Sequence, residues 1–405
     1  MNRPIVGRRG FLGGLAGVGA AAALGTGLAG SALAADDASA MYAFEGPHQG
    51  GILTPAQRAA AFVAFDATAA DKAELADLFQ EITGRARFLI AGGTPANIGL
   101  TDSPSDNGVL GPVVPGDGLT VTLSVGASLF DARFGLSGVK PAKLSTMPAF
   151  PNDALDRTIC DGDLLLQICA DNQDTVVHAL REIARATRGG MQVRWRQDGF
   201  VSPPRPSGTP RNLMGFKDGT SNLSTSDAKL MDQLVWTHAG RGEPAWAEGG
   251  SYHVVRVIRM LVEFWDRVNL REQENMIGRR KDTGAPQSGT DEFDTPDFGS
   301  DPEGEVIQKG AHIRLANPRT AQTDNQRILR RPFNYDNGTD PNGNLDMGLI
   351  FAAFNQDVER QFVAIQTRLI DEALVDYISP VGGGYFFALP GVKDSADWLG
   401  SALFT

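Results

Sequence analysis

The sequence predicts a duplicated α+β fold, and three observations support this prediction. Residues 163–174 align without a gap on residues 346–357, at a constant offset of 183 positions. Each segment is an apolar run of strand length that ends in Asn-Gln-Asp, which suits the start of a helix, and a helical pattern follows it. A further strand candidate followed by a helix candidate precedes each copy. We therefore expect two similar halves built from strand and helix units.

The first half contains four strand candidates and two helix candidates. Its strand candidates are short apolar runs, whereas its helix candidates repeat apolar residues every three to four positions. In chain order the elements are a strand at 61–65, a helix at 71–83, a strand at 119–124, a strand beginning at 163, a helix after 174 and a strand at 192–195.

The second half repeats this composition. Its elements are a strand at 253–258, a helix at 262–277, a strand at 313–315, a strand beginning at 346, a helix after 357 and a strand at 385–388. About four strands and two main helices in each half fit a ferredoxin-like α+β sandwich that is made twice.

The boundary between the halves is predicted at a proline-rich linker. Residues 202–210 contain too much Pro and Gly for a helix or a central strand. The domains that follow the N-terminal signal are therefore expected at 35–205 and 206–405. Two other irregular stretches, 92–115 and 282–304, predict long surface loops, which are uncommon in compact domains unless they serve a site or are mobile.

Residues 1–34 have the composition of an export signal. Arg8 and Arg9 precede a run of apolar and small residues at 11–24, and the segment ends in Ala-Leu-Ala at Ala34. This order is typical of a cleavable signal, and the paired arginines indicate the twin-arginine route. A membrane anchor is the alternative, but glycines interrupt the run and its length is marginal for the ~20 residues of a spanning helix. We expect a mature chain without a membrane span, located in the periplasm or another extracytoplasmic space.

The net charge of the chain disfavours a nucleic-acid partner. It is −11, and removal of the expected signal, which carries three arginines and no acidic residue, makes it −14. No dense cluster of Lys and Arg interleaved with aromatic residues offsets this charge.

The two cysteines, Cys160 and Cys169, do not have the spacing of a metal site, and the sequence leaves open whether they are bridged or are buried thiols.

Five histidines are candidates for holding a transition metal or a haem iron. Three have positions in a helix, a loop and a strand start where structural roles are expected: His178, His238 and His253. His48 and His312 remain. A lone His312 would most simply be structural too, but five arginines crowd residues 314–331, and arginines suit the propionates of a haem. No zinc-binding His-Glu-x-x-His spacing competes with this interpretation.

Residues 215–219 form a Gly-x-x-Asp-Gly pattern that places Asp218 beside a glycine turn. Alone the pattern is weak, because a chain with 48 glycines contains such sequences by chance and a simple Asp-Gly turn explains it. Its functional interpretation is that the glycines let the backbone approach a flat ligand while Asp218 points at that ligand. With His312 and Arg330 downstream, the chain offers an acid/base, an iron ligand and a fixed cation, which suit cleavage of a peroxide bond on haem.

Together these segments resemble the dye-decolourising peroxidases, haem enzymes with two ferredoxin-like domains of the dimeric α+β barrel type. The resemblance rests on residues 215–219, residues 312–319 and Arg330. It extends over the mature chain through further segments at 46–52, 278–286, 345–348 and 382–391. The chain looks most similar to the exported twin-arginine branch, which includes the periplasmic deferrochelatase/peroxidases.

The resemblance implies a role for each matching residue. His312 is the expected proximal iron ligand, Asp218 the distal acid/base and Arg330 the distal cation. Cofactor contacts are implied for Gly219, Thr220, Ser221, Arg279, Asn317, Pro318, Arg319 and Arg330.

One further role and one departure also follow from the resemblance. Asp357 is the expected partner of the second ring N–H of the proximal histidine, because an anion there makes the ligand more electron-donating. Its duplicate Asp174 is expected to be only a helix cap. Pro332 is the departure, since some relatives carry an asparagine at that position.

The implied activity is that of a haem b peroxidase with one haem per chain. It would use hydrogen peroxide to oxidise dyes and other small aromatic reductants. Because a carboxylate is a weaker base than imidazole, activity is expected to be best at acidic pH. Bulky dyes could donate electrons through surface aromatic residues such as Trp236, Trp246 or Trp265, although ordinary packing explains any one of them.

Two alternatives remain open at this point. One is a deferrochelatase that releases iron from haem with the porphyrin intact and acts with iron-uptake components. The other is a periplasmic haem-binding protein without turnover. The resemblance also leaves a homodimer open.

Overall fold

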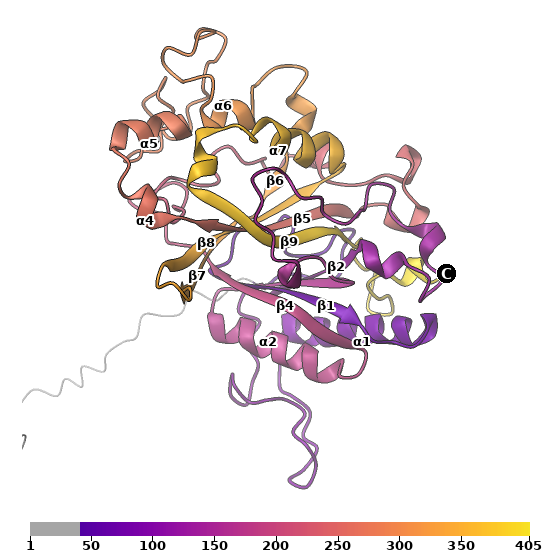
Figure 1. The fold of residues 1–405 in the computed structure, drawn as a ribbon. Coiled ribbons are helices and arrows are strands. Elements are labelled where there is room, and N and C mark those ends of the chain that lie inside the picture. Colours follow the sequence, from indigo (N-terminus) through magenta and orange to yellow (C-terminus); the bar gives the residue numbers. More distant parts are fainter. Residues whose placement is uncertain (1–40) are drawn as a thin grey trace, which may run out of the picture. The chain divides into compact units, whose positions relative to one another are not determined.

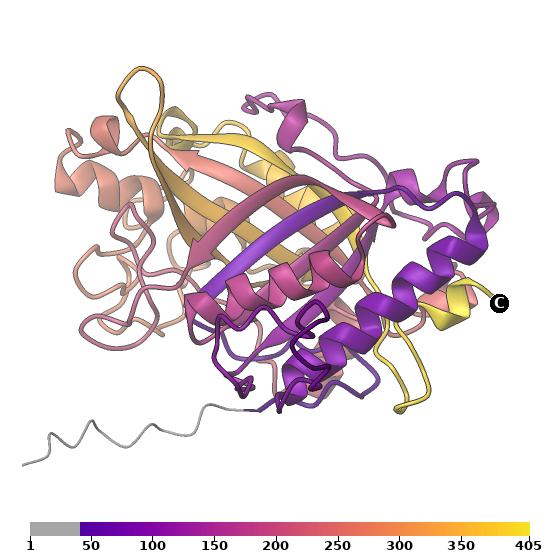
Figure 2. The ribbon, with the colours of Figure 1, turned by 90° about the horizontal axis from the view of Figure 1, so that it is seen from below.

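The centre of the fold is a closed ring of antiparallel strands (Figures 1 and 2). The computed structural model describes residues 41–405, and the signal expected at residues 1–34 lies outside them. The strand order is β5-β9-β2-β3-β1-β4-β7-β8, and a pairing between β5 and β8 closes the ring, while β6 joins β8. The strands are β1 (Ala59–Ala67), β2 (Thr120–Gly126), β3 (Leu164–Ala170), β4 (Met191–Phe200), β5 (Ser251–Met260), β6 (Leu329–Arg330), β7 (Phe333–Thr339), β8 (Leu345–Asn355) and β9 (Ile378–Ala388).

Helices cover the outside of the ring in two groups. The α-helices are α1 (Lys72–Ala91), α2 (Gln173–Ala186), α3 (Ala228–Leu234), α4 (Val262–Trp265), α5 (Leu270–Ile277), α6 (His312–Ala316) and α7 (Ala364–Arg368). A π-helical turn, η7 (Glu359–Val363), runs directly into α7. Short 3-10 turns are η1 (Ala127–Phe130), η2 (Ser137–Val139), η3 (Arg157–Ile159), η4 (Ala239–Arg241), η5 (Ala245–Ala247), η6 (Asp324–Gln326), η8 (Ala373–Asp376) and η9 (Ser401–Leu403). Figure 1 shows α1 and α2 on one side of the ring and α5, α6 and α7 on the other. Among residues 41–405, no helix combines the length and apolar character required to cross a membrane.

The predicted duplicated α+β fold is confirmed by the repeated elements. Strand β3 followed by α2 corresponds to β8 followed by η7 and α7. Ala59 pairs with Ala170 in the first half, and Val254 pairs with Ala353, 183 residues after Ala170, in the second. The halves share the ring, because β2 pairs with β9 and β4 pairs with β7. Residues 201–210, where the boundary is predicted, form neither helix nor strand.

Two sequence-based element predictions are wrong in the second half. The expected helix at 262–277 is divided into α4 and α5, because Asn269 caps a new helix by accepting a hydrogen bond from the backbone N–H of Glu272 at 3.1 Å. The expected strand at 313–315 is the helix α6. Three alternating residues are too few to distinguish the two periodicities, and Pro318 restricts the chain soon after the helix ends.

The first half has a closely packed interface between its helices and its strands. Ala61, Val63 and Phe65 of β1 are buried against apolar residues of α1 and α2, including Leu78 and Ile183. Figure 2 shows these two helices side by side across the strands. Because the register makes Val254 equivalent to Ala59, these three β1 residues correspond to Arg256, Ile258 and Met260 of β5.

In the second half the equivalent positions border a cavity, although Met260 also packs in a cluster with residues of α4 and α5. Arg256, Ile258 and Met260 line it from the strand side, and residues of α6 and α7 line it from the helix side. The duplicated fold therefore has a filled helix–strand interface in one half and an open one in the other.

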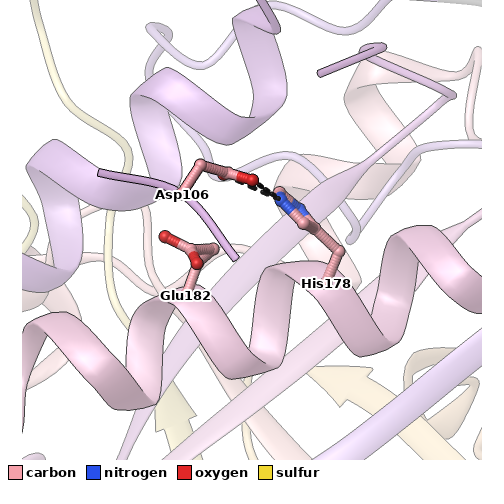
Figure 3. Close-up of side chains that lie close together, drawn as sticks. All are labelled: Asp106, His178 and Glu182. Carbon is pink, nitrogen blue, oxygen red and sulfur yellow. Dashed lines mark hydrogen bonds and ion pairs between the residues drawn. The ribbon is translucent and has the colours of Figure 1, made fainter. Parts of the chain in front are cut away.

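A buried ionic cluster anchors the long loop at 92–118 to α1 and α2 of the first half. His178 Nε2 lies 2.9 Å from Asp106, and Figure 3 shows Glu182 one turn further along α2. Oε1 of Glu182 accepts two hydrogen bonds from Asn107, and Oε2 pairs with Arg85 and Arg185. These donors occupy both carboxylate oxygens of Glu182, so we assign the cluster a structural role rather than a metal-binding one.

We expect Glu182→Gln to destabilise the protein. The substitution leaves Arg85 and Arg185 without their shared buried carboxylate, and loss of one partner from a buried ion pair costs about 3 kcal/mol. The free energy of unfolding, measured by urea denaturation, should fall accordingly. Glu81→Gln, at an exposed position of α1, is the matched control. Equal stability of the two variants would contradict the structural role.

Candidate functional site

The cavity of the second half lies between a strand wall and a helix wall, both largely apolar. Its volume is about 280 Å³, counted as space that the centre of a water molecule can enter. A single water needs about 10–15 Å³ in that measure, so the cavity is of ligand size. The strand wall carries apolar residues: Ile258, Met260, Leu349 and Phe351. The opposite wall includes His312, Ile313 and Ala316 of α6 together with Ile365 and Leu369.

His312 lies at the first position of α6 with one ring nitrogen fixed. Its Nδ1 is 2.7 Å from Oε2 of Glu372, a residue with only 3% of its side chain exposed. No hydrogen bond from a described residue occupies Nε2, and 33% of the side chain is accessible because the ring borders the cavity. Nε2 is therefore available to a metal ion in the cavity.

The charge of Glu372 affects the protonation of His312. Burial alone disfavours the imidazolium, but the charge and the hydrogen bond of Glu372 outweigh burial and raise the pKa of His312 above its ordinary value. The same carboxylate fixes Nδ1–H as the donor when the ring is neutral, which directs the lone pair to Nε2.

The prediction that Asp357 is the partner of His312 is wrong, because Glu372 has that position. Asp357 Oδ1 instead accepts hydrogen bonds from the backbone N–H groups of Glu359 and Arg360, both at 3.0 Å. It therefore caps the helical segment that follows β8. Its duplicate Asp174 lies in the first turn of α2 and accepts from Thr175 N at 3.0 Å. The expectation that Asp174 caps the helix is therefore wrong: Asn172 occupies the N-cap position of α2, and Asp174 accepts from the residue next to it.

Asp218 and Arg330 form an ion pair on the cavity wall. Nη1 of Arg330 donates to Oδ1 of Asp218 at 2.8 Å, and both side chains are more than two-thirds buried. Two hydrogen bonds with Asn222 hold Arg330: its backbone N–H donates to the amide oxygen at 2.9 Å, and its carbonyl accepts at 2.7 Å. The cavity thus contains Asp218, Arg330 and His312 together, as the sequence predicts.

The loop that carries Asp218 depends on its two glycines for different reasons. Gly215 has φ +87° and lies so close to Lys281 that an added Cβ would be 2.6 Å from its side chain. Gly219 has φ +105°, and an added Cβ would meet no atom within 4 Å, so its requirement is conformational. Because Gly219 lines the cavity, it leaves open space beside Asp218.

A cluster of arginines borders the cavity next to this loop. Nη2 of Arg279 donates to Ser221 Oγ at 3.2 Å, and Nη2 of Arg319 donates to the same oxygen at 3.4 Å. Neither guanidinium has an ion pair with a carboxylate of residues 41–405. Burial, followed by the charge of a neighbouring arginine, lowers the pKa of each below its ordinary value. Two unpaired cations at the edge of an apolar cavity suit a ligand with anionic groups.

Most of the other predicted cofactor contacts border the same space. Thr220, Ser221 and Asn317 line the cavity and also an adjoining outer cavity that includes Phe293 and Arg327. Pro318 does not line either cavity, although it follows Asn317 directly. Its position next to the positive φ of Arg319, +57°, gives it a role in the turn rather than in the cavity wall.

Sequence reasoning missed the contribution of the first half to the cavity. Asp153 forms a buried ion pair with Arg256 of β5, and Asn152 donates to the carbonyl of Ile370 at 2.6 Å. Both Asn152 and Arg256 line the cavity. A loop of the first half therefore contributes Asn152 to the cavity wall, and no motif in residues 150–156 indicates this.

The three tryptophans considered as surface electron donors are buried. Trp236 is 5% exposed, Trp246 is 8% exposed and Trp265 is 1% exposed. Trp236 stacks on His48 with ring centroids 3.6 Å apart, and Trp265 donates from its indole N–H to Met214 at 3.0 Å. Their packing roles account for them, and none is a surface residue.

Comparisons with known proteins agree with the fold. The family description "Dyp-type peroxidase, N-terminal" matches residues 49–201, and "Dyp-type peroxidase, C-terminal" matches residues 209–393. The chain is 53% identical over 365 residues to the deferrochelatase of Escherichia coli K12, with 89% of this chain and 86% of that protein covered. Ferric DtpA from Streptomyces lividans is 38% identical with a TM-score of 0.81 over 91% of this chain and 98% of that one. A DyP-type peroxidase from Cellulomonas bogoriensis is 36% identical with a TM-score of 0.80, covering 91% and 99%.

We expect Glu372→Gln to lower the pKa of His312, because the substitution removes the negative charge that raises it. In the wild type, the stability that comes from the raised pKa is present below the ordinary histidine value and is lost as the pH rises through the raised value. NMR titration of the imidazole in cofactor-free protein, with His312→Ala for assignment, measures the pKa directly. Asp357→Asn should leave it unchanged, and an equal effect of both variants would refute the assigned pairing.

Proposed function

Because the chain belongs to the Dyp-type peroxidase family, we propose that it is a haem b peroxidase that binds one haem per chain and uses hydrogen peroxide to oxidise dyes and other small aromatic reductants. The observation that carries this proposal is the placement of His312, Asp218 and Arg330 around one cavity with apolar walls. Nε2 of His312, which has no hydrogen-bond partner among the described residues, would hold the haem iron. The unpaired Arg279 and Arg319 suit the two propionates.

The residues of this chain have distinct roles in the proposed reaction. When bound, haem supplies a redox-active iron that takes up oxidising equivalents from peroxide and passes them to reductants. Asp218 accepts a proton from one peroxide oxygen and delivers it to the other, so that water can leave. Arg330, which remains charged, stabilises the negative charge that develops as the O–O bond breaks. Glu372 holds the proximal imidazole and increases its electron donation.

The ion pair between Asp218 and Arg330 supports this division of roles. An oxygen atom of Asp218 held 2.8 Å from the guanidinium is fixed in the cavity wall. Fixed groups require little rearrangement when charge develops, which is the main source of electrostatic catalysis. Gly219 beside Asp218 leaves room for a small molecule such as peroxide.

Export is part of the proposal and rests on residues 1–34 alone. Their paired arginines and apolar run support the twin-arginine route to the periplasm or another extracytoplasmic space. That route carries proteins that have already folded, which is compatible with uptake of a cofactor before export.

A second candidate function is release of iron from haem with the porphyrin intact. It is favoured by the 53% identity to proteins named deferrochelatase over most of the chain. The same cavity would hold the haem substrate, and the same arginines would hold its propionates. Components of iron uptake are the partners that this function implies.

We expect Asp218→Asn to slow the reaction with hydrogen peroxide by roughly 10²- to 10⁴-fold, because an amide cannot accept the proton. Stopped-flow absorbance of the haem-loaded protein gives the second-order rate constant. The Soret band before mixing should stay near that of the wild type, since Arg330 and His312 are retained. Asp77→Asn, at an exposed position of α1, is the control. An unchanged rate in Asp218→Asn would favour a haem-binding protein in which Asp218 has no catalytic role.

The two candidate functions differ in their products. If the chain is a deferrochelatase, haem-loaded protein kept under reducing conditions should yield metal-free porphyrin, which is detected by its fluorescence. If it acts only as a peroxidase, no metal-free porphyrin should form while peroxide-dependent oxidation of an aromatic reductant continues. His312→Ala should lose the wild-type axial ligation in the absorption spectrum. Retention of that ligation would remove the basis of both functions.

A further inference from the structure

The helix that carries His312 is too short to hold its own orientation. Helix α6 spans five residues, and its N-cap, Ala311, makes no side-chain hydrogen bond. Its internal bonds include Leu315 N to Ala311 O at 3.1 Å and Asn317 N to Ile313 O at 3.3 Å. Isolated helices of this length are unstable in water, so neighbouring segments must fix α6.

Two contacts fix the start and the outer side of α6. Gly278, with φ +90°, lies so close that an added Cβ would be 2.7 Å from the side chain of Ile313. Arg314 donates to the carbonyl oxygens of Asp301 and Ile307 at 2.7 and 2.8 Å. These contacts connect α6 to α5 and to the long loop before it. They leave the carbonyl groups at the C-terminal end of α6 to be satisfied by other donors.

Arg368 satisfies those carbonyl groups from the last position of α7. Its Nε donates to Leu315 O at 2.8 Å, and its Nη2 donates to Ala316 O at 3.3 Å. Its Nη1 donates to Oε1 of Gln326 at 2.6 Å. A cation at a helix C-terminus is also favourable for the helix dipole. The planar guanidinium therefore ties the end of α6 to two other segments.

We propose that Arg368 is a positioning residue that sets the orientation of α6 and thereby the direction of Nε2 of His312. Four residues later, Glu372 holds Nδ1 of the same histidine. The segment 368–372 thus fixes both the backbone of α6, through Arg368, and the ring, through Glu372. This inference rests on the proposed function, in which His312 is the axial ligand of haem.

A direct electrostatic role of Arg368 is the competing explanation, because its side chain also lines the cavity. Lysine distinguishes the two roles. A lysine at this position retains the positive charge, but it lacks the flat fork that reaches two backbone carbonyls and an amide oxygen together. If charge alone matters, Arg368→Lys behaves like the wild type. If the hydrogen bonds of the guanidinium matter, Arg368→Lys and Arg368→Met are affected alike.

The test measures hydrogen exchange of residues 311–317 in the mature protein, with and without haem, by mass spectrometry. In both Arg368→Met and Arg368→Lys we expect these amides to exchange about tenfold faster, as loss of hydrogen bonds to a charged donor implies. In the haem-loaded, reduced protein, the iron–histidine stretching band in resonance Raman spectra should shift or broaden in both variants. Arg360→Met is the matched control, because Arg360 donates to Gln356 and Gln361 and makes no hydrogen bond to α6.

Two results would overturn the proposal. One is that Arg368→Met, shown by circular dichroism to be folded, has the wild-type exchange rate at residues 311–317 and an unchanged iron–histidine stretching band. The other is full restoration of both signals in Arg368→Lys, which would assign the residue an electrostatic role. A failure of the proposed function is distinguished by His312→Ala, which would then keep the wild-type absorption spectrum. Hydrogen exchange of residues 311–317 in the haem-free protein still tests whether Arg368 fixes α6.

Discussion

The separation of helices from strands in the second half is the constraint on which the site depends. In the first half, Ala61, Val63 and Phe65 pack directly against α1 and α2, as is usual for an α+β sandwich. At the register-equivalent positions of the second half, the strand surface faces a cavity and the helical segments α6 and α7 are short. A cavity lined by apolar residues forfeits dispersion contacts and burial, which a flat apolar ligand would restore. The site and the stability of the second half are therefore coupled.

Side-chain hydrogen bonds to backbone carbonyl groups position the segments around the cavity. Arg368 donates to a carbonyl group of α6, and Arg314 of α6 donates to the carbonyl of Ile307 in the preceding loop. Asn222 donates to the carbonyl of Arg330 in the short strand β6. Hydrogen bonds of this kind are directional, whereas apolar packing is not. Directional hydrogen bonds therefore fix α6, which carries His312, and β6, which carries Arg330, whereas the apolar walls of the cavity impose no strict orientation.

The duplication and most strands have local signals in the sequence, whereas the roles of His312, Asp218 and Arg330 came from combining their motifs with the resemblance to a known family. The gapless offset between 163–174 and 346–357 identified equivalent elements, and the glycine pattern marked Asp218. Local signals failed where a residue acts through distant contacts. Glu372 lies 60 positions from His312 and no spacing connects them, whereas Asp357 had a conspicuous motif that serves a helix start. Helix α6 is predicted as a strand because its five residues are too few to show a helical periodicity, and surrounding segments rather than its own sequence stabilise it.

The pairing of β2 with β9 and of β4 with β7 makes the two halves inseparable in a specific sense. A duplication event would first yield two equal modules, but here neither half retains a complete set of partners. Cutting the chain at the linker would expose β7 and β9 as free edges, which invite association with other strands. It would also remove Asn152 from the cavity wall and Asp153 from its ion pair with Arg256. The half that contains His312 therefore depends on the first half for its strand partners, so substitutions in one half constrain those that the other can accept.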